Sequence, residues 1–113
     1  GKCLDSLSPA SRIVVIDSGS TDKTVAIAET KQAEVFQFSY QGGYPKKRQW
    51  AMDNVPINTP WLLLLDADEV IPAPLWEEIA HAIYFLADNT QSSFMTGQAL
   101  IVDGGATARL STE

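Results

Sequence analysis

Two stretches of the sequence decide the fold: IVVIDSGSTD at residues 13–22 and WLLLLDADE at residues 61–69. Each is a short apolar run that ends abruptly in carboxylates. Apolar runs of this length are typical of strands that are buried on both faces of a parallel sheet. Open α/β sheets bind their ligands at the carboxyl ends of such strands. We therefore expect acidic groups to converge at one edge of the sheet: Asp17, Asp22, Asp66 and Asp68.

The rest of the chain alternates between helix and strand signals. Helices are expected at residues 2–7, directly after the acidic loop that ends at residue 22, at 45–54 and at 75–87. Strands are expected at residues 12–16, 34–38, 61–65 and 99–102, with a kinked connector at 71–74 and a polar loop at 88–93. This alternation predicts an α/β fold with a Rossmann-like, mainly parallel sheet of three or four strands and helices on its faces. The large aromatic side chains of Trp50, Trp61 and Trp76 are expected in or near the core.

The composition excludes several classes of protein. With 113 residues the chain has room for one domain, and 45% hydrophobic residues are enough to build a core. The net charge of −6 argues against a general nucleic-acid binder, which needs a basic face. The longest apolar run is too short to span a bilayer, and the N-terminus does not resemble a signal peptide. Cys3 is the single cysteine, which predicts a reducing, cytoplasmic setting, and the start without Met suggests a fragment.

The second acidic stretch has the pattern of a cation site. Asp66 and Asp68 flank Ala67 directly after the predicted strand, so that both carboxylates can point into one site. Hard carboxylate oxygens suit Mg²⁺ or Mn²⁺, which commonly also take phosphate oxygens of a substrate as ligands. Such a metal neutralises a diphosphate leaving group. The alternative is an ordinary solvated turn, because the three-residue pattern is common.

The other candidate residues flank this pattern in the sequence. Asp17 ends the first acidic strand, where its carboxylate can accept a hydrogen bond from a ribose or a base, whereas Asp22 is expected to cap the next helix. The alternative for this loop is an ordinary β–α turn. Arg48 belongs to the compact basic cluster at residues 46–48 and can clamp a phosphate, with a solvated helix face as the alternative. His81 is assigned no role.

Three motifs in this order resemble family 2 glycosyltransferases of the GT-A fold, and in particular the bacterial enzymes that add sugars to the lipopolysaccharide core. The motifs are RIVVIDSGSTDKT at 12–24, KRQWA at 47–51 and LDADE at 65–69, and the resemblance covers residues 1–76. It implies an incomplete nucleotide-sugar domain of the GT-A type. It also implies that the nucleotide-sugar is bound by Asp17, Ser18, Arg48 and Asp66, and that the metal is bound by Asp66 and Asp68. Ser18 lies where many members carry a second acid of the nucleotide site.

The C-terminal part resembles another family. The sequences EEIAHAIYFLAD at 77–88 and SFMTGQALIVDGG at 93–105 are similar to the last helix, loop and strand of short-chain dehydrogenases/reductases. Residues 77–113 are therefore expected to be a structural piece, packed with residues 1–76 as one domain. They carry none of the catalytic residues of that family.

The two resemblances leave three readings. The first is the donor-binding part of a metal-dependent glycosyltransferase, inactive as this fragment, because the first strand and the catalytic base of that family are missing. It implies a nucleotide-sugar donor, a glycan or lipid-linked acceptor, no nucleic acid, and peripheral membrane association of the parent enzyme. The second reading is a fragment of a short-chain dehydrogenase/reductase, and the third is a non-catalytic chimeric α/β domain.

Overall fold

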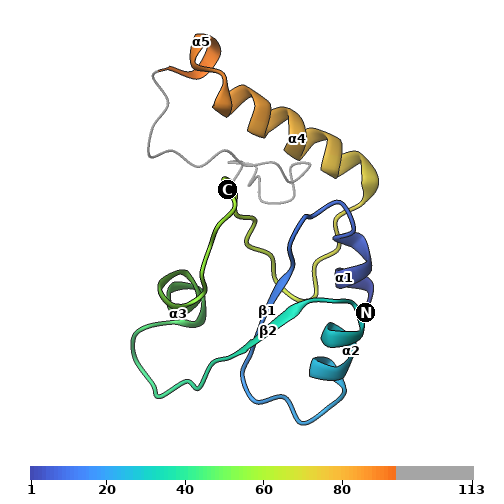
Figure 1. Ribbon diagram of the computed structural model, residues 1–113, viewed down its shortest axis with the longest axis vertical. Helices are drawn as coiled ribbons and strands as arrows, with labels where there is room; N and C mark the ends of the chain where they lie inside the picture. The colour runs from blue at the N-terminus through green and yellow to red at the C-terminus, as the bar shows by residue number, and fades with distance from the viewer. Residues whose placement is uncertain (94–113) are drawn as a thin grey trace, which may run out of the picture. The chain divides into compact units, whose positions relative to one another are not determined.

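The computed structural model describes residues 1–93 and divides the chain into two compact units, Gly1–Val70 and Ile71–Glu113. The first unit is built on a β–α–β motif (Figure 1). Strand β1 (Val14–Asp17) pairs in parallel with β2 (Glu34–Gln37), with Val15 opposite Val35 and Asp17 opposite Gln37. Helix α2 (Thr24–Thr30) is the crossover that a parallel pair requires. The predicted α/β class is confirmed.

The predicted central strand at residues 61–65 is wrong. Within residues 1–93, where three of the predicted strands lie, the sheet has two strands, β1 and β2. An extended segment becomes a strand only when its backbone groups pair with a neighbouring strand, and segment 61–65 has no such pairing. Four of its five residues are correspondingly exposed, at 45% for Trp61 and 50% for Leu62, so the expected burial of Trp61 is also wrong.

Two further helices belong to the first unit. Helix α1 (Lys2–Ser6) lies with α2 on one side of the strands, and α3 (Lys47–Asn54) lies on the other (Figure 1). The side chains of Lys31 and Asp5 form an ion pair, with 2.6 Å between Nζ and Oδ1, which ties the C-terminal end of α2 to α1. Helix α3 begins two residues later than predicted, because the chain preceding Lys47 is extended.

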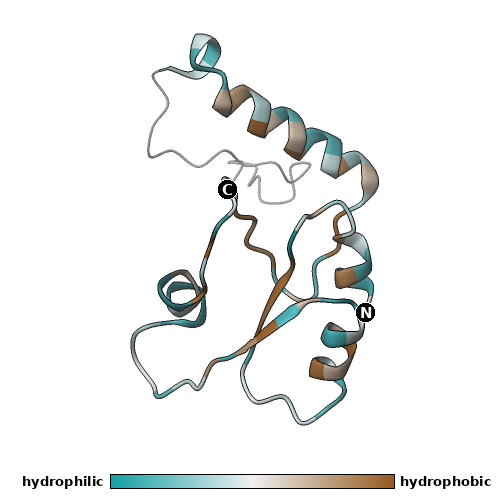
Figure 2. Cartoon of the chain, viewed as in Figure 1, coloured by the Kyte–Doolittle hydropathy of each residue, from teal (hydrophilic) through white to brown (hydrophobic). Residues whose placement is uncertain are grey.

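The core of the first unit is small. Four apolar side chains of this unit are buried: Ala28, Ala33, Phe38 and Val55. Apolar residues colour most of β1 brown in Figure 2, in agreement with the sequence of the strand. Trp50 is half-buried, and its ring lies 5.3 Å from that of Phe38, so its predicted place near the core is confirmed.

Arg12, two residues before β1, connects this part of the chain to β2 and to the loop that contains Pro56 and Asn58. Its guanidinium forms an ion pair with Glu34, the first residue of β2, and donates to the carbonyl oxygen of Pro56. It also lies 3.4 Å from Oδ1 of Asn58. The pairing with Arg12 lowers the pKa of Glu34. These contacts fix the loop that leads from α3 to segment 61–65.

The second unit contains helix α4 (Ala73–Ala87) and the short helix α5 (Asn89–Ser92). The kinked connector predicted at 71–74 is wrong in part, because Ala73 and Pro74 form the first turn of α4, where proline is tolerated. The polar loop predicted at 88–93 is likewise replaced by α5, whose first turn is capped by the carboxylate of Asp88. The predicted strand at 99–102 lies outside the described residues.

The exposed and half-buried faces of α4 follow its sequence. The predicted inner positions Ile79, Ala82, Ile83 and Leu86 are half-buried, as is Trp76, and His81 is exposed. None of the helices within residues 1–93 combines the length and the apolar composition needed to cross a membrane.

Candidate functional site

The DADE sequence forms a tight turn whose ends are hydrogen-bonded to each other. The backbone amide of Glu69 donates to the carbonyl oxygen of Asp66 (3.0 Å), and the Glu69 carboxylate accepts from the amide of Asp66 (2.7 Å). Asp66 and Asp68 both remain exposed. The turn therefore holds the backbone between the two aspartates while both carboxylates stay open to solvent.

Arg48 reaches this turn from helix α3. Its Nη2 lies 2.6 Å from Oδ1 of Asp66, with 60% of the Arg48 side chain and 64% of the Asp66 side chain exposed. Arg48 lies in the first turn of α3, and its partner Asp66 lies 18 residues later in the sequence. The structure thus brings together two of the residues that the sequence predicted separately, one as a phosphate-binding cation and the other as a ligand of a metal and a nucleotide-sugar.

Asp17 is engaged within its own loop. It is 4% exposed, and its Oδ2 accepts from the amides of Gly19 and Ser20 at 3.0 Å each. Its Oδ1 accepts from the hydroxyl of Ser20. The Ser20 hydroxyl, followed by the Ser20 amide, lowers the pKa of Asp17. Asp17 therefore stabilises the loop between β1 and α2. Gly19 adopts a positive φ of 73° in this loop, a backbone conformation that glycine tolerates without strain.

The expected convergence of acidic groups is not what the described residues show. Within residues 1–93, no three side chains of His, Cys, Asp or Glu are close enough together to hold a metal ion. Asp22 accepts instead from the amide of Thr24 at 2.9 Å, which satisfies a free amide of the first turn of α2. The Thr24 side chain, followed by the Thr24 amide, lowers the pKa of Asp22. The N-cap residue of α2 is Lys23, without a side-chain cap, so that Asp22 binds the first turn from one position before the N-cap instead of occupying it. The nucleotide contacts assigned to Asp17 and the exposed Ser18 stay predictions.

Sequence reasoning missed the role of Glu69 and the position of Cys3. The Sγ atom of Cys3 lies 3.9 Å from the carbonyl oxygen of Asp66, which places α1 beside the acidic turn. Partial burial and the negative charges of Glu69 and Asp68 raise the pKa of the Cys3 thiol. Cys3 and Asp66 are 63 residues apart, so no local sequence pattern predicts their contact. Glu69 follows Asp66 by three residues, and this short spacing could have predicted a hydrogen bond within the turn.

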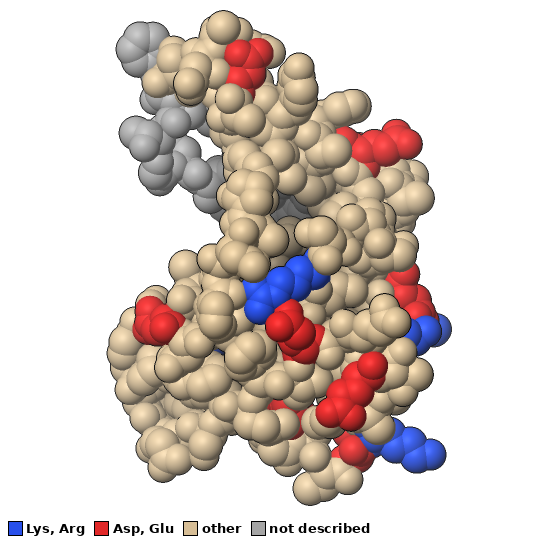
Figure 3. Space-filling model, in the orientation of Figure 1, with Lys and Arg blue, Asp and Glu red and all other residues tan. Residues whose placement is uncertain are grey.

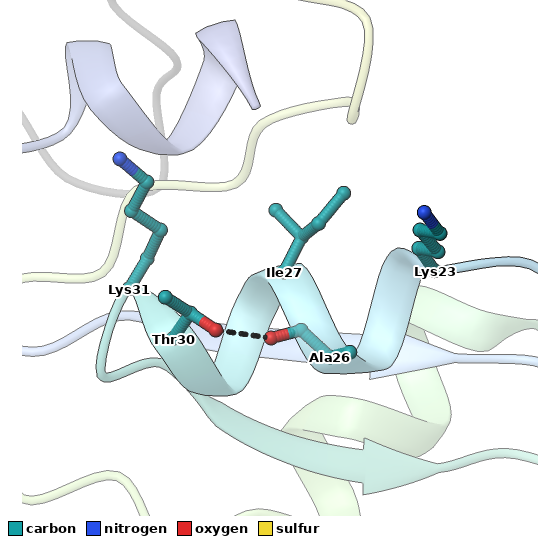
Figure 4. A pocket seen from close by; sticks show the side chains of 5 residues that line it. All are labelled: Lys23, Ala26, Ile27, Thr30 and Lys31. Atoms are coloured by element: carbon teal, nitrogen blue, oxygen red, sulfur yellow. Dashed lines mark hydrogen bonds between the residues drawn. The ribbon is translucent and has the colours of Figure 1, made fainter.

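A shallow hollow of about 240 Å³ lies elsewhere on the first unit, along α2. Figure 4 shows its lining by side chains of a single helix, namely Lys23, Ala26, Ile27, Thr30 and Lys31. The hydroxyl of Thr30 is turned back to the carbonyl oxygen of Ala26 at 2.8 Å. The hollow contains none of the predicted site residues. On the face drawn in Figure 3, several basic side chains lie directly beside acidic ones, so that no broad basic surface forms there.

The sequence is similar to those of known glycosyltransferases. Residues 1–104 match the family model described as "Glycosyl transferase family 2". The chain is 36% identical to the lipopolysaccharide core biosynthesis glycosyltransferase LpsC of Rhizobium meliloti (strain 1021) over 81 residues, which are 68% of this chain and 29% of that protein. It is 35% identical to an uncharacterized glycosyltransferase of Rickettsia bellii (strain RML369-C) over 89 residues, which are 79% of this chain and 28% of that protein.

The chain thus spans less than a third of the length of these relatives. No solved structure matches it. The family match includes the part of the chain that resembles short-chain dehydrogenases/reductases up to residue 104, and that second resemblance stays a prediction. Because the family model covers nearly the whole sequence, the chain belongs to glycosyl transferase family 2.

Proposed function

We propose that this chain is the donor-binding part of a metal-dependent glycosyltransferase, and that the Arg48–Asp66 pair marks the place of the donor diphosphate. The observation that carries the proposal is the distance of 2.6 Å between Arg48 Nη2 and Asp66 Oδ1. Both side chains are largely exposed, so that the pair can open to admit a ligand. A guanidinium is suited to bind phosphate oxygens, and a carboxylate is suited to bind the cation that accompanies them.

The acidic turn fits Mg²⁺ or Mn²⁺ in the chemistry of its donors. Asp66 and Asp68 supply two exposed carboxylates, and a cation of this kind is commonly held by one or two carboxylates together with substrate phosphates. When bound, the cation neutralises the diphosphate of the donor. The Glu69 carboxylate accepts from the Asp66 amide, and this hydrogen bond keeps the shape of the turn whether or not a cation is bound.

The nucleoside end of the donor is assigned to the loop after β1. Asp17 and Ser18 follow the strand directly, and the hydrogen bonds of Asp17 to Gly19 and Ser20 give the loop a fixed backbone. The exposed Ser18 hydroxyl is available to the donor. Preformed loops of this kind bind ligands with a low cost in conformational entropy.

The acceptor is proposed as a glycan or a lipid-linked glycan, because the Rhizobium relative is named for biosynthesis of the lipopolysaccharide core. Peripheral membrane association is proposed for the parent enzyme on the same ground. The single cysteine fits a reducing, cytoplasmic compartment. We assign no general base among residues 1–93 and therefore expect the 113 residues to bind a donor without transferring its sugar.

Isothermal titration with UDP, with and without Mn²⁺, tests this proposal. We expect UDP to bind with measurable heat only in the presence of Mn²⁺, and this heat to be lost in Asp68→Ala. The matched control is Asp53→Ala, which removes an exposed aspartate whose contact is with Gln49 on the same helix. If millimolar UDP with Mn²⁺ gives no heat, the donor-binding proposal is wrong. Fluorescence-detected binding of NADPH would instead favour the dehydrogenase reading, and the absence of binding to either ligand would favour a non-catalytic domain.

A further inference from the structure

The loop between β2 and α3 presents aromatic side chains to solvent. Tyr40 is 52% exposed and Tyr44 is 75% exposed. Between them Gly42 and Gly43 have positive φ angles of 86° and 68°, a conformation that side-chain-bearing residues rarely adopt. The hydroxyl of Tyr40 lies 3.4 Å from the carbonyl oxygen of Gly43, so that the loop is held back toward Tyr40 before it reaches Tyr44.

A lysine ammonium is held against one of these rings. Nζ of Lys46 lies 2.8 Å from the hydroxyl oxygen of Tyr40 and 5.1 Å from the centroid of the Tyr40 ring. An ammonium has three donors, and the tyrosine hydroxyl uses one of them. The remaining donors are available to an anionic group on a ligand that lies beside the tyrosines.

The loop is attached to the proposed donor site through a row of rings. The ring of Tyr40 lies 6.2 Å from that of Phe38, which is buried, and Phe38 lies 5.3 Å from Trp50 of α3. The same helix carries Arg48 to Asp66. The position of the loop is therefore coupled by packing to the helix that supplies the phosphate-binding cation.

We propose that Tyr40, Tyr44 and Lys46 form a subsite for an acidic sugar of the glycan acceptor. This inference rests on the proposed function, because it names the acceptor of the same glycosyltransferase. The flat face of a tyrosine ring matches the C–H face of a pyranose, and the Lys46 ammonium matches a carboxylate or phosphate on that ring. Such a subsite combines apolar contact with one placed cation.

An anionic membrane is the competing partner of an exposed loop with tyrosine and lysine. Membrane recognition by basic segments takes clusters of about four to eight Lys or Arg. The basic cluster here has three members, Lys46, Lys47 and Arg48, and Arg48 is paired with Asp66. The observations therefore favour the acidic sugar.

Glucuronic acid, a pyranose with one carboxylate, is the probe for the test. Binding to the 113-residue chain is followed by amide chemical shifts in NMR spectra, with methyl glucoside and inorganic phosphate as the neutral and ring-free comparisons. We expect glucuronic acid to bind more tightly than either. Tyr44→Ala and Lys46→Met should each weaken this binding by about two- to tenfold, whereas Tyr44→Phe, which keeps the ring, should leave it unchanged. The matched control is Tyr84→Ala, which removes a tyrosine of similar exposure (74%) from α4.

The outcomes separate this proposal from the one on the donor. Binding of glucuronic acid that is insensitive to Tyr44→Ala overturns the subsite, as does binding of phosphatidylserine vesicles through Tyr44 without binding of the sugar. UDP with Mn²⁺ should bind Tyr44→Ala as tightly as the unchanged chain. If the unchanged chain binds glucuronic acid through Tyr44 but does not bind UDP with Mn²⁺, the subsite stands and the donor proposal fails. The reverse result leaves the donor proposal standing and overturns the subsite.

Discussion

Replacement of Arg48 by alanine should change the affinities for metal and for nucleotide in opposite directions. In the structure Arg48 forms an ion pair with Asp66, with 2.6 Å between Arg48 Nη2 and Asp66 Oδ1. Two unit charges at this distance attract by about 1.6 kcal/mol in bulk water. Both side chains are about 60% exposed, and pairs of this kind contribute about 0.2–1 kcal/mol. Without Arg48, Mn²⁺ alone should therefore bind the acidic turn about 1.4- to 5-fold more tightly.

The effect on nucleotide is expected to be larger and of opposite sign. Arg48→Ala removes a charge-assisted hydrogen bond to the donor diphosphate, which is worth about 1.5–3 kcal/mol. The affinity for UDP in the presence of Mn²⁺ should accordingly fall about 10- to 150-fold. Electron paramagnetic resonance of free Mn²⁺ measures the first constant, and isothermal titration measures the second.

Lys47→Ala is the control, because it removes the same charge from the neighbouring position of α3 without removing the pair with Asp66. It should change both constants by less than Arg48→Ala does. The reasoning is refuted if Arg48→Ala weakens binding of Mn²⁺, or if it leaves the affinity for UDP with Mn²⁺ unchanged. Either result would mean that the pair is a surface contact with no part in donor binding.

Three further predictions follow from the same contacts. Glu69→Gln should retain donor binding, since an amide oxygen can still accept from the Asp66 amide, whereas Glu69→Ala should weaken binding of UDP with Mn²⁺ by loosening the turn, as titration will show. Phe38→Ala should destabilise the fold by about 3–5 kcal/mol in urea unfolding, because it empties the buried position between Tyr40 and Trp50. The lowered pKa of Asp17 contributes stability that is fully present above the unfolded pKa of about 3.9 and is lost as the pH falls through the folded pKa. The melting temperature of Asp17→Asn should therefore depend less on pH in the acid range than that of the unchanged chain.

The local elements were predictable because their signals are local. The apolar run before Asp17, the crossover helix α2 and the amphipathic face of α4 follow from residue types within a few positions of each other. The strand predicted at 61–65 failed for the complementary reason. Its leucines favour burial, but a strand also needs a hydrogen-bonding partner, and the sequence of the segment does not contain one.

The sequence by itself determined the α/β class, the β–α–β motif and the identity of the candidate residues Arg48, Asp66 and Asp68. Only the tertiary structure decided which of them meet. Packing of α3 through Trp50 and Phe38 brings Arg48 to Asp66. The carboxylate of Asp17 accepts hydrogen bonds from amides of its own loop instead of joining a shared acidic cluster. Contacts between distant residues depend on how helices and strands pack, and a motif specifies the chemistry of a side chain without specifying its neighbours.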